Sequence, residues 1–474
     1  MKKERINYIA LWLILFLSSF VYGQNKVNIG SKILSYEAYI GYVKTHHPLV
    51  KQANLILSSG EANVLKSRGG FDPKIEVDYN TKDFKKKDYY DLFNATFKVP
   101  TWYGVEFKAN YEENSGQFLN SQNNVPVEGL YSAGVSVSAI EGLLINDRMA
   151  TLKKAKLFLK QSEADRNLAV NDLLFEATLA YFDWIKANNE QQIYSNFLKN
   201  ATIRFKATKR RVEVGDKAPI DSVESKITIQ NRALGQEAAF LKRVKSTYKV
   251  SNFLWSNDIP LELQLDVLPQ IPTTAILESS LEIENLEAEG FMIENHPKMQ
   301  SLNYKIDGLN VDRRLKLNKL LPKLNFNYNF ISSTPEETNT FNRNEYKAGF
   351  SFSTPLFLRK ERGDLRLTKF KLQDANFELL STELKIKNKV EVAYAEINSL
   401  EKQYQMINEI LENYVTMVNA EERKFFLGES SLFLINSRER KLIDAQLKQS
   451  ELQIKLLNTR AKLFNTLGMN PLVN

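Results

Sequence analysis

The chain of 474 residues contains an internal duplication, and this feature limits most strongly what it can fold into. In each copy a His-Pro pair is followed 25 residues later by a Pro-Lys pair and an alternating apolar run. The two His-Pro pairs, His47-Pro48 and His296-Pro297, lie 249 positions apart, and residues 131–138 likewise resemble residues 346–353. Because solenoid repeats are only about 20 to 50 residues long, this duplication predicts two equivalent halves of one architecture.

The first 23 residues have the pattern of a secretory signal peptide. The basic residues Lys2, Lys3 and Arg5 precede an apolar stretch at 9–20, and small residues precede Gln24. We therefore expect cleavage before Gln24. The alternative, an uncleaved anchor helix, is disfavoured because the apolar stretch is shorter than the roughly 20 residues that span a bilayer.

Several classes of site are excluded by what the sequence lacks. The absence of cysteine excludes disulfides, thiolate metal sites, a thiol nucleophile and lipidation of an N-terminal cysteine. The three histidines match no metal-ligand spacing, and no phosphate-binding glycine loop or nucleophile motif occurs. The net charge of +8 comes from interspersed signs without a nucleic-acid-binding module. We expect no enzymatic activity, catalytic residue, cofactor, metal or nucleic-acid partner.

Two long segments, 143–214 and 364–427, are free of both proline and glycine. They predict helices of about 100 Å each, far longer than a globular core needs. The second segment carries a heptad seam, whose alternating spacings of 3 and 4 are typical of coiled-coil packing. The seam consists of Val390, Ala393, Ile397, Leu400, Tyr404, Ile407, Leu411, Tyr414 and Val418.

Both long segments end at a similar turn and are followed by a second helical segment, to about residue 255 in the first half and 467 in the second. Glycine just after a helix can adopt the left-handed conformation that caps it. The pattern therefore predicts two antiparallel helical hairpins, each preceded upstream by a shorter helix, at 36–68 and 298–320. The two turns are Val214-Gly215-Asp216 and Leu427-Gly428-Glu429.

Each half also inserts strand-like sequence before its long helix. Residues 323–331 and 345–354 alternate apolar and polar side chains on either side of a polar loop, and residues 74–84 and 130–139 occupy the same places in the first half. Their lengths match the roughly 9 to 11 residues of a tilted membrane strand. The first half has a longer insert, in which 93–99 and 105–111 form a possible extra hairpin. Whether this hairpin joins the sheet or forms a surface flap stays open.

The number of strands predicts an oligomer. Four strands, or six with the insert, are fewer than the about eight that close a membrane barrel, and open edges cannot face lipid. Three chains with four strands each would form a 12-stranded barrel. Along the chain we expect a signal peptide (1–23), a first repeat (24–255), an inter-repeat segment (256–290) and a second repeat (291–474).

In duplication, element order and paired turns, nearly all of the chain after residue 23 resembles the outer-membrane efflux proteins, the TolC-like channels of Gram-negative bacteria. The resemblance implies a mixed α and β fold: a homotrimer with a β-barrel in outer-membrane lipid, continued by a long α-helical barrel in the periplasm. A mixed equatorial region would contain the termini and the inter-repeat segment. It also implies a passive exit duct of a tripartite efflux or type I secretion system, opened when a periplasmic adaptor and an inner-membrane pump dock.

The same resemblance assigns roles to the two turns. The adaptor-docking tips would be Val214, Gly215, Asp216, Leu427, Gly428 and Glu429. In the family an aspartate follows the first glycine by six residues, and Asp221 stands there, although a carboxylate near a helix N-terminus is favourable without any gate role. At the second turn the family's gate-linking tyrosine and arginine are replaced by Phe425 and Ser430. Its tunnel-constricting aspartates are replaced by Leu434 and Ser437, with Asn436 between them. The candidate gate residues are thus Asp221, Phe425, Leu434 and Asn436.

The second turn is also unusually apolar, which predicts an adaptor-facing surface or an apolar gate. Ordinary packing between neighbouring hairpins is the alternative. The apolar residues there are Phe425, Phe426, Leu427, Leu432 and Phe433.

A different class of function is a secreted coiled-coil structural or adhesive protein without channel activity. It would account for the signal peptide and the heptads. It would not account for amphipathic strand pairs at matching positions in each half.

Overall fold

The computed structural model describes residues 33–281, 292–336 and 342–468, so the predicted signal peptide lies outside the described residues. The described chain forms two compact units. One contains residues 33–50, 173–281 and 393–464, and the other contains most of 51–172, 292–392 and 465–468. Each unit combines residues from both predicted repeats, so the repeats are not separate domains.

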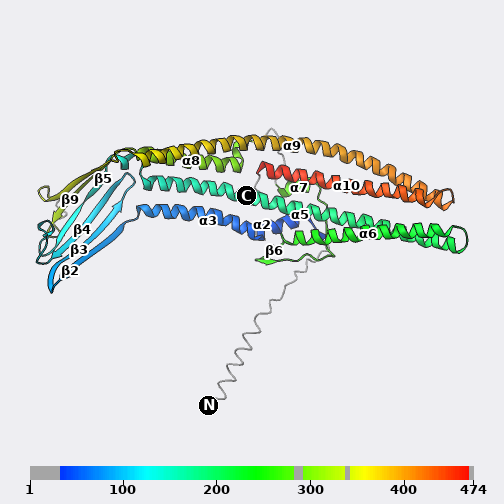
Figure 1. Cartoon of the computed structure of the whole chain (residues 1–474), viewed down its shortest axis with the longest axis horizontal. Helices are drawn as coiled ribbons and strands as arrows, with labels where there is room; N and C mark the ends of the chain where they lie inside the picture. Colours follow the sequence, from blue (N-terminus) through cyan, green and yellow to red (C-terminus); the bar gives the residue numbers. More distant parts are fainter. Residues whose placement is uncertain (1–32, 282–291, 337–341, 469–474) are drawn as a thin grey trace, which may run out of the picture. The chain divides into compact units, whose positions relative to one another are not determined.

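The second unit contains one antiparallel sheet of six strands among the described residues, in the order β10-β9-β5-β4-β3-β2 (Figure 1). The four predicted strands are confirmed, and the insert joins the sheet as two further strands. The choice between four and six strands, which the sequence left open, is therefore six, because backbone hydrogen bonds of β5 continue into the insert. The strands are β2 (Lys74–Phe84), β3 (Lys87–Pro100), β4 (Val105–Ser115), β5 (Leu130–Ser138), β9 (Lys323–Ser332) and β10 (Tyr346–Ser353).

The register of the sheet separates apolar and polar side chains onto opposite faces, as expected from the period of two along a strand. Two neighbouring rows that cross all six strands illustrate this separation. The apolar row consists of Tyr346, Phe330, Ala133, Ala109, Phe97 and Ile75. The polar row consists of Lys347, Asn329, Gly134, Lys108, Lys98 and Lys74.

The helices agree closely with the predicted segments, with one difference. The predicted helix at 36–68 is two helices, interrupted at His47, because the residue before a proline is disfavoured in the α conformation. No helix in the described part of the chain is long and apolar enough to cross a membrane. The main helices are α2 (Tyr36–His46), α3 (Pro48–Arg68), α5 (Asp147–Glu213), α6 (Pro219–Ser251), α8 (Pro297–Asn318), α9 (Arg359–Phe426) and α10 (Leu432–Leu467).

The heptad seam of α9 is buried or half-buried along its length. Leu400 and Ile407 pack against Leu452 of α10. Nearer the turn, Val418 packs with Phe197 of α5 and Leu442 of α10. The seam is therefore a packing surface, as predicted, and it joins the two hairpins α5–α6 and α9–α10 in the first unit.

The described part of the inter-repeat segment, residues 256–281, lies beside the start of the described chain. Strand β1 (Ile33–Leu34) pairs in parallel with β8 (Leu268–Pro269). The Tyr181 hydroxyl oxygen lies within hydrogen-bond distance of a carbonyl oxygen on each side of this pair, Leu34 O at 2.7 Å and Gln270 O at 2.8 Å. Burial raises the pKa of Tyr181 well above its ordinary value. The short elements nearby are β6 (Trp255–Ser256), β7 (Ile259–Pro260) and α7 (Thr274–Leu281).

Candidate functional site

The two predicted turns, which we call the first tip (residues 214–218) and the second tip (residues 427–431), have the same backbone geometry. At the first tip, Gly215 N donates to Val212 O at 3.0 Å and Asp216 N donates to Arg211 O at 2.8 Å. At the second, Gly428 N donates to Phe425 O at 3.1 Å and Glu429 N donates to Lys424 O at 2.9 Å. This pair of bonds is the Schellman motif, which satisfies the last carbonyl groups of a helix.

Both turns require glycine for conformational reasons. Gly215 has φ of 81° and Gly428 has φ of 80°, in the left-handed region that side chains other than glycine rarely adopt. Among the described residues, no heavy atom outside the adjacent chain lies within 4 Å of a Cβ built at either position. The requirement therefore comes from the backbone alone and not from crowding.

The first tip is largely open to solvent. Asp216 Oδ2 accepts from Arg211 Nε at 2.9 Å, which ties the turn to the last turn of α5. Val214 is exposed, and Asp221 lies in the first turn of α6, where a carboxylate interacts favourably with the helix dipole.

The apolar residues in the second tip and in the helix ends beside it divide into two groups. Phe425 and Leu432 are buried and pack with Ile435. Lys217 Nζ of the first tip lies 5.6 Å from the centre of the Phe425 ring, a cation–π distance. Three apolar residues point outward instead: Phe426 is 76% exposed, Phe433 is 70% exposed and Leu427 is 67% exposed. Packing within the chain thus accounts for only part of this apolar sequence.

The remaining candidate gate residues differ in what they contact. Leu434 is exposed, whereas Asn436 Nδ2 lies 3.5 Å from Glu224 Oε1 of α6. Phe425 and Asn436 therefore both face the chain's own first hairpin. Beside them, Glu421 accepts from Arg438 Nε at 2.7 Å and from the Ser430 hydroxyl.

Behind the tips lies a buried charge cluster to which each of the four helices contributes one residue. Glu439 of α10 is 1% exposed and accepts from Arg204 of α5 at 2.8 Å and from Arg232 of α6 at 3.4 Å. Glu422 of α9 completes it, 3.5 Å from Arg204. This cluster cannot be recognised from the sequence, since its members are widely separated along the chain and each resembles an ordinary charge on a solvated helix face.

A groove of about 250 Å³ runs beside this cluster. It lies between α5 and α9, and its floor includes buried Phe425 and its rim exposed Phe426. The lining residues are Asn200, Ile203, Arg204, Ala207, Glu422, Phe425, Phe426 and Ile435.

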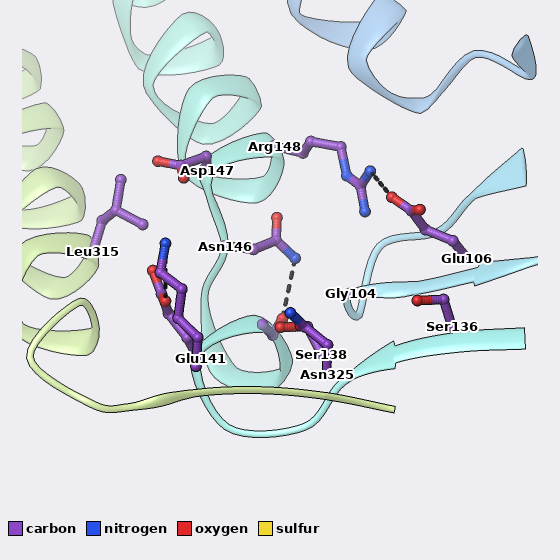
Figure 2. A pocket seen from close by; sticks show the side chains of 12 residues that line it. Gly104, Glu106, Ser136, Ser138, Glu141, Asn146, Asp147, Arg148, Leu315 and Asn325 are labelled. Carbon is purple, nitrogen blue, oxygen red and sulfur yellow. Dashed lines mark hydrogen bonds and ion pairs between the residues drawn. The ribbon is translucent and has the colours of Figure 1, made fainter. Parts of the chain in front are cut away.

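A second cavity, of about 480 Å³, lies at the helix end of the sheet in the other unit (Figure 2). Polar-face residues of the strands, among them Glu106, Ser136 and Asn325, line one side of it. On another side, Arg148 at the start of α5 donates to Glu106 at 2.7 Å. The lining is polar and internally paired, and no group of three or more potential metal ligands occurs among the described residues.

The duplicated histidines are structural caps. His296 Nδ1 accepts from Lys298 N at 3.0 Å, and His47 Nδ1 accepts from Leu49 N at 3.2 Å. With Nδ1 as acceptor, the neutral His296 ring carries its hydrogen on Nε2 and donates it to Thr466 O at 3.2 Å. Burial lowers the pKa of both histidines below the ordinary value of 6.5. The matching geometry agrees with the sequence repeat.

Comparison with known proteins agrees with this architecture. The sequence profile of the family described as Outer membrane efflux protein matches residues 292–469. The second half of the chain therefore matches this family. No curated protein matches the chain. The matched residues comprise the second predicted repeat, which lacks the extra hairpin of the first.

Solved structures with the same fold match most of this chain. The CmeC outer membrane channel of Campylobacter jejuni has a TM-score of 0.65 at 13% identity, covering 91% of this chain and 85% of that chain. VceC of Vibrio cholerae has a TM-score of 0.65 at 10% identity, covering 91% and 95%. The MtrE channel of Neisseria gonorrhoeae, in its open state, has a TM-score of 0.60 at 15% identity, covering 91% and 88%.

Proposed function

We propose that this protein is the passive outer-membrane channel of a tripartite efflux system. Three copies form one channel, with the sheet in the outer membrane and the helical hairpins in the periplasm. A periplasmic adaptor docks at the tips, and an inner-membrane pump supplies the energy for transport. Type I secretion would use the same architecture with a different pump.

One observation carries the proposal: the six strands segregate apolar and polar side chains onto opposite faces in a chain with the fold of solved outer-membrane channels. The apolar face suits lipid and the polar face suits a water-filled lumen, as in membrane barrels. Exposed aromatic residues such as Phe350 and Phe352 would be an aggregation liability in water. A secreted coiled-coil protein has no use for such a face.

The tips supply the docking surface in this proposal. Val214, Gly215 and Asp216 of the first tip and Leu427, Gly428 and Glu429 of the second are positioned by equivalent turns, so they recur in a regular pattern around a trimer. The exposed side chains of Phe426, Leu427 and Phe433 offer the apolar area that an adaptor would cover. Photo-crosslinkers at Leu427 and Phe433 should capture the adaptor of the cognate pump. Phe377, which is equally exposed on α9, is the matched control position.

Two of the four candidate gate residues remain available for a gate. Leu434 is exposed and Asp221 is half-buried, whereas Phe425 and Asn436 hold the two hairpins of one chain together. We assign the constriction to Leu434 and Asp221 and a positioning role to Phe425 and Asn436.

Conductance of the purified trimer in planar lipid bilayers tests this function. We expect a closed or weakly conducting channel that Leu434→Asp opens, with an unchanged yield of trimer. Glu451→Gln, on the exposed face of α10, is the control and should leave conductance unchanged. If neither the wild-type protein nor the variant conducts ions, or if the protein fractionates as soluble without detergent, the channel proposal is wrong.

A further inference from the structure

The extra hairpin β3–β4 has features that a surface flap would not need. We propose that this hairpin is part of the transmembrane barrel wall, so that six strands from each of three copies close an eighteen-stranded barrel. In this barrel, edge strand β2 of one copy pairs with edge strand β10 of the next. The inference rests on the proposed function, because it assumes that the sheet lies in the outer membrane.

The first supporting observation is that the lipid-facing pattern passes through the hairpin without a break. The apolar row enters β4 at Ala109 and β3 at Phe97 before it reaches Ile75 of β2. The polar row crosses the same strands at Lys108 and Lys98. A one-residue shift in the pairing of the hairpin would place its apolar side chains on the polar face of the sheet. The apolar and polar rows of the hairpin need to match those of the neighbouring strands only if all six strands share one apolar surface and one aqueous surface.

The second observation is that the turn of the hairpin is fixed to the helices at the base of the sheet. Trp102 in this turn stacks on Phe71, with ring centres 5.4 Å apart. Both rings pack against a buried cluster formed by Val64 of α3 with Leu152 and Ala155 of α5. The turn is therefore a packed part of the structure.

Backbone contacts hold the same turn from its other side. Gly104 O accepts from Ser138 N at 3.0 Å, and Asn146 Nδ2 donates to Trp102 O at 3.0 Å. A Cβ at Gly104 would lie 2.8 Å from Gly142 O, so the two backbones meet too closely for side chains. These contacts set the height of β3 and β4 relative to β5, which fixes the register of the wall.

The edges of the sheet indicate how it closes. β2 and β10 are its two unpaired edges, and their residues are exposed throughout. Because neighbouring strands alternate in direction, β2 runs antiparallel to β10, so the edges of two copies can pair in the antiparallel manner of membrane barrels. Six strands cannot close alone, and an open edge in lipid leaves backbone groups unsatisfied. A second copy of this chain is the partner that the geometry requires at each edge.

The consequence is a wider lumen than four strands per chain would give. Barrel diameter grows roughly linearly with strand number, and barrels of about 16 to 18 strands enclose an aqueous channel. In this channel the outer-membrane segment would not limit the size of the cargo, and the constriction would lie at the helical tips.

Spin labels at single cysteines test whether the hairpin lies in the membrane, and the absence of native cysteine makes each label unique. In the trimer in lipid vesicles, Phe107→Cys on the apolar face of β4 should be accessible to oxygen dissolved in lipid. Lys108→Cys on the polar face should be accessible to a water-soluble nickel complex. Phe326→Cys and Asn325→Cys on β9 are the matched controls, since β9 is a wall strand whether or not the hairpin inserts.

The control strand distinguishes the two possible failures. Lipid and water accessibility that alternates on both β4 and β9 supports the inference. Alternation on β9 with both β4 positions in water overturns it and leaves the channel function standing. If neither strand alternates, the outer-membrane location itself is wrong.

Closure between copies is tested by paired cysteines on the two edges. Ile75→Cys, Val77→Cys and Tyr79→Cys of β2 are each combined with Ala348→Cys, Phe350→Cys and Phe352→Cys of β10. At least one combination should give covalent dimers and trimers on oxidation, and none should give larger rings. Val77→Cys with Lys347→Cys or Ser351→Cys is the control, because these side chains lie on opposite faces. Failure of all nine combinations in an assembled trimer would refute edge closure by β2 and β10.

Discussion

A substitution at the turn glycine Gly428 should change only one contribution to stability, the conformational energy of the backbone. Its φ of 80° is unfavourable for alanine, and among the described residues no heavy atom outside the adjacent chain would contact the new methyl group. Gly428→Ala should therefore destabilise the closed turn by about 1 to 2 kcal/mol, the cost of the left-handed conformation for a residue with a Cβ. Since RT is about 0.6 kcal/mol, this corresponds to a roughly 5- to 30-fold increase in local opening.

Hydrogen–deuterium exchange of the Glu429 amide measures this opening directly, because that N–H closes the turn by donating to Lys424 O at 2.9 Å. We expect exchange at this amide to increase by the same 5- to 30-fold factor estimated from the strain. Gly308→Ala is the matched control: it also has no atoms within 4 Å of a new Cβ, but it lies inside α8 without a positive φ. There alanine should stabilise the helix by roughly 0.5 to 1 kcal/mol. Unchanged exchange at Glu429 in Gly428→Ala would refute the argument that backbone strain requires glycine at this tip.

Three further predictions concern the charge cluster, acid stability and orientation. Glu439→Gln should destabilise the first unit by about 3 to 5 kcal/mol in thermal unfolding, because two buried arginines lose their shared carboxylate. The exposed pair Lys448–Glu451 on the same helix is the control, and Glu451→Gln should cost less than about 1 kcal/mol. Burial lowers the folded-state pKa of His47 and His296 below 6.5, so the unfolded chain binds more protons in acid, and the free energy of unfolding should be full above pH 6.5 and fall as pH decreases below it. The double variant His47→Asn with His296→Asn keeps a capping acceptor at each position and should remove this histidine-dependent loss of stability in acid. An unchanged pH profile of stability in the double variant would contradict the prediction. Trypsin added to intact cells should cut at Arg343 in the β9–β10 connection and should cut at Arg210 beside the first tip only after the outer membrane is permeabilised. Cleavage in the reverse order would show that the proposed orientation in the membrane is wrong.

Local patterns in the sequence predicted most of the fold. The heptad seam predicted the buried face of α9, and the two glycines predicted where α5 and α9 end, because both features depend on neighbours within a few residues. The alternating runs predicted strands within a few residues of their observed bounds. Such local patterns do not predict which strands pair with each other, however. The insert was therefore recognisable as a hairpin, whereas its pairing with β5 required the structure.

The candidate site was less predictable, since its contacts join residues that are distant in sequence. Phe425 and Phe426 are adjacent aromatic residues, yet one is buried and the other exposed, and the difference depends on Lys217 and Ile435 from other elements. The cluster around Glu439 is a similar case, since its carboxylate is 235 positions from Arg204. The predicted boundaries of the signal peptide, repeats and inter-repeat segment remain predictions, as do the roles of the tip residues.

The charge cluster and the tips together constrain how such a channel could open. Separating the hairpin α5–α6 from the hairpin α9–α10 within one chain would break the contacts of Glu439 with Arg204 and Arg232 and leave buried charges unpaired. That cost, about 3 to 5 kcal/mol per chain, would be incurred three times in a trimer. Sliding of exposed tip surfaces between copies would break no buried ion pair, since Phe426, Leu427 and Phe433 are apolar and at least 67% exposed. We therefore expect the two hairpins of one chain to move as one body during opening, with the motion confined to the boundaries between copies.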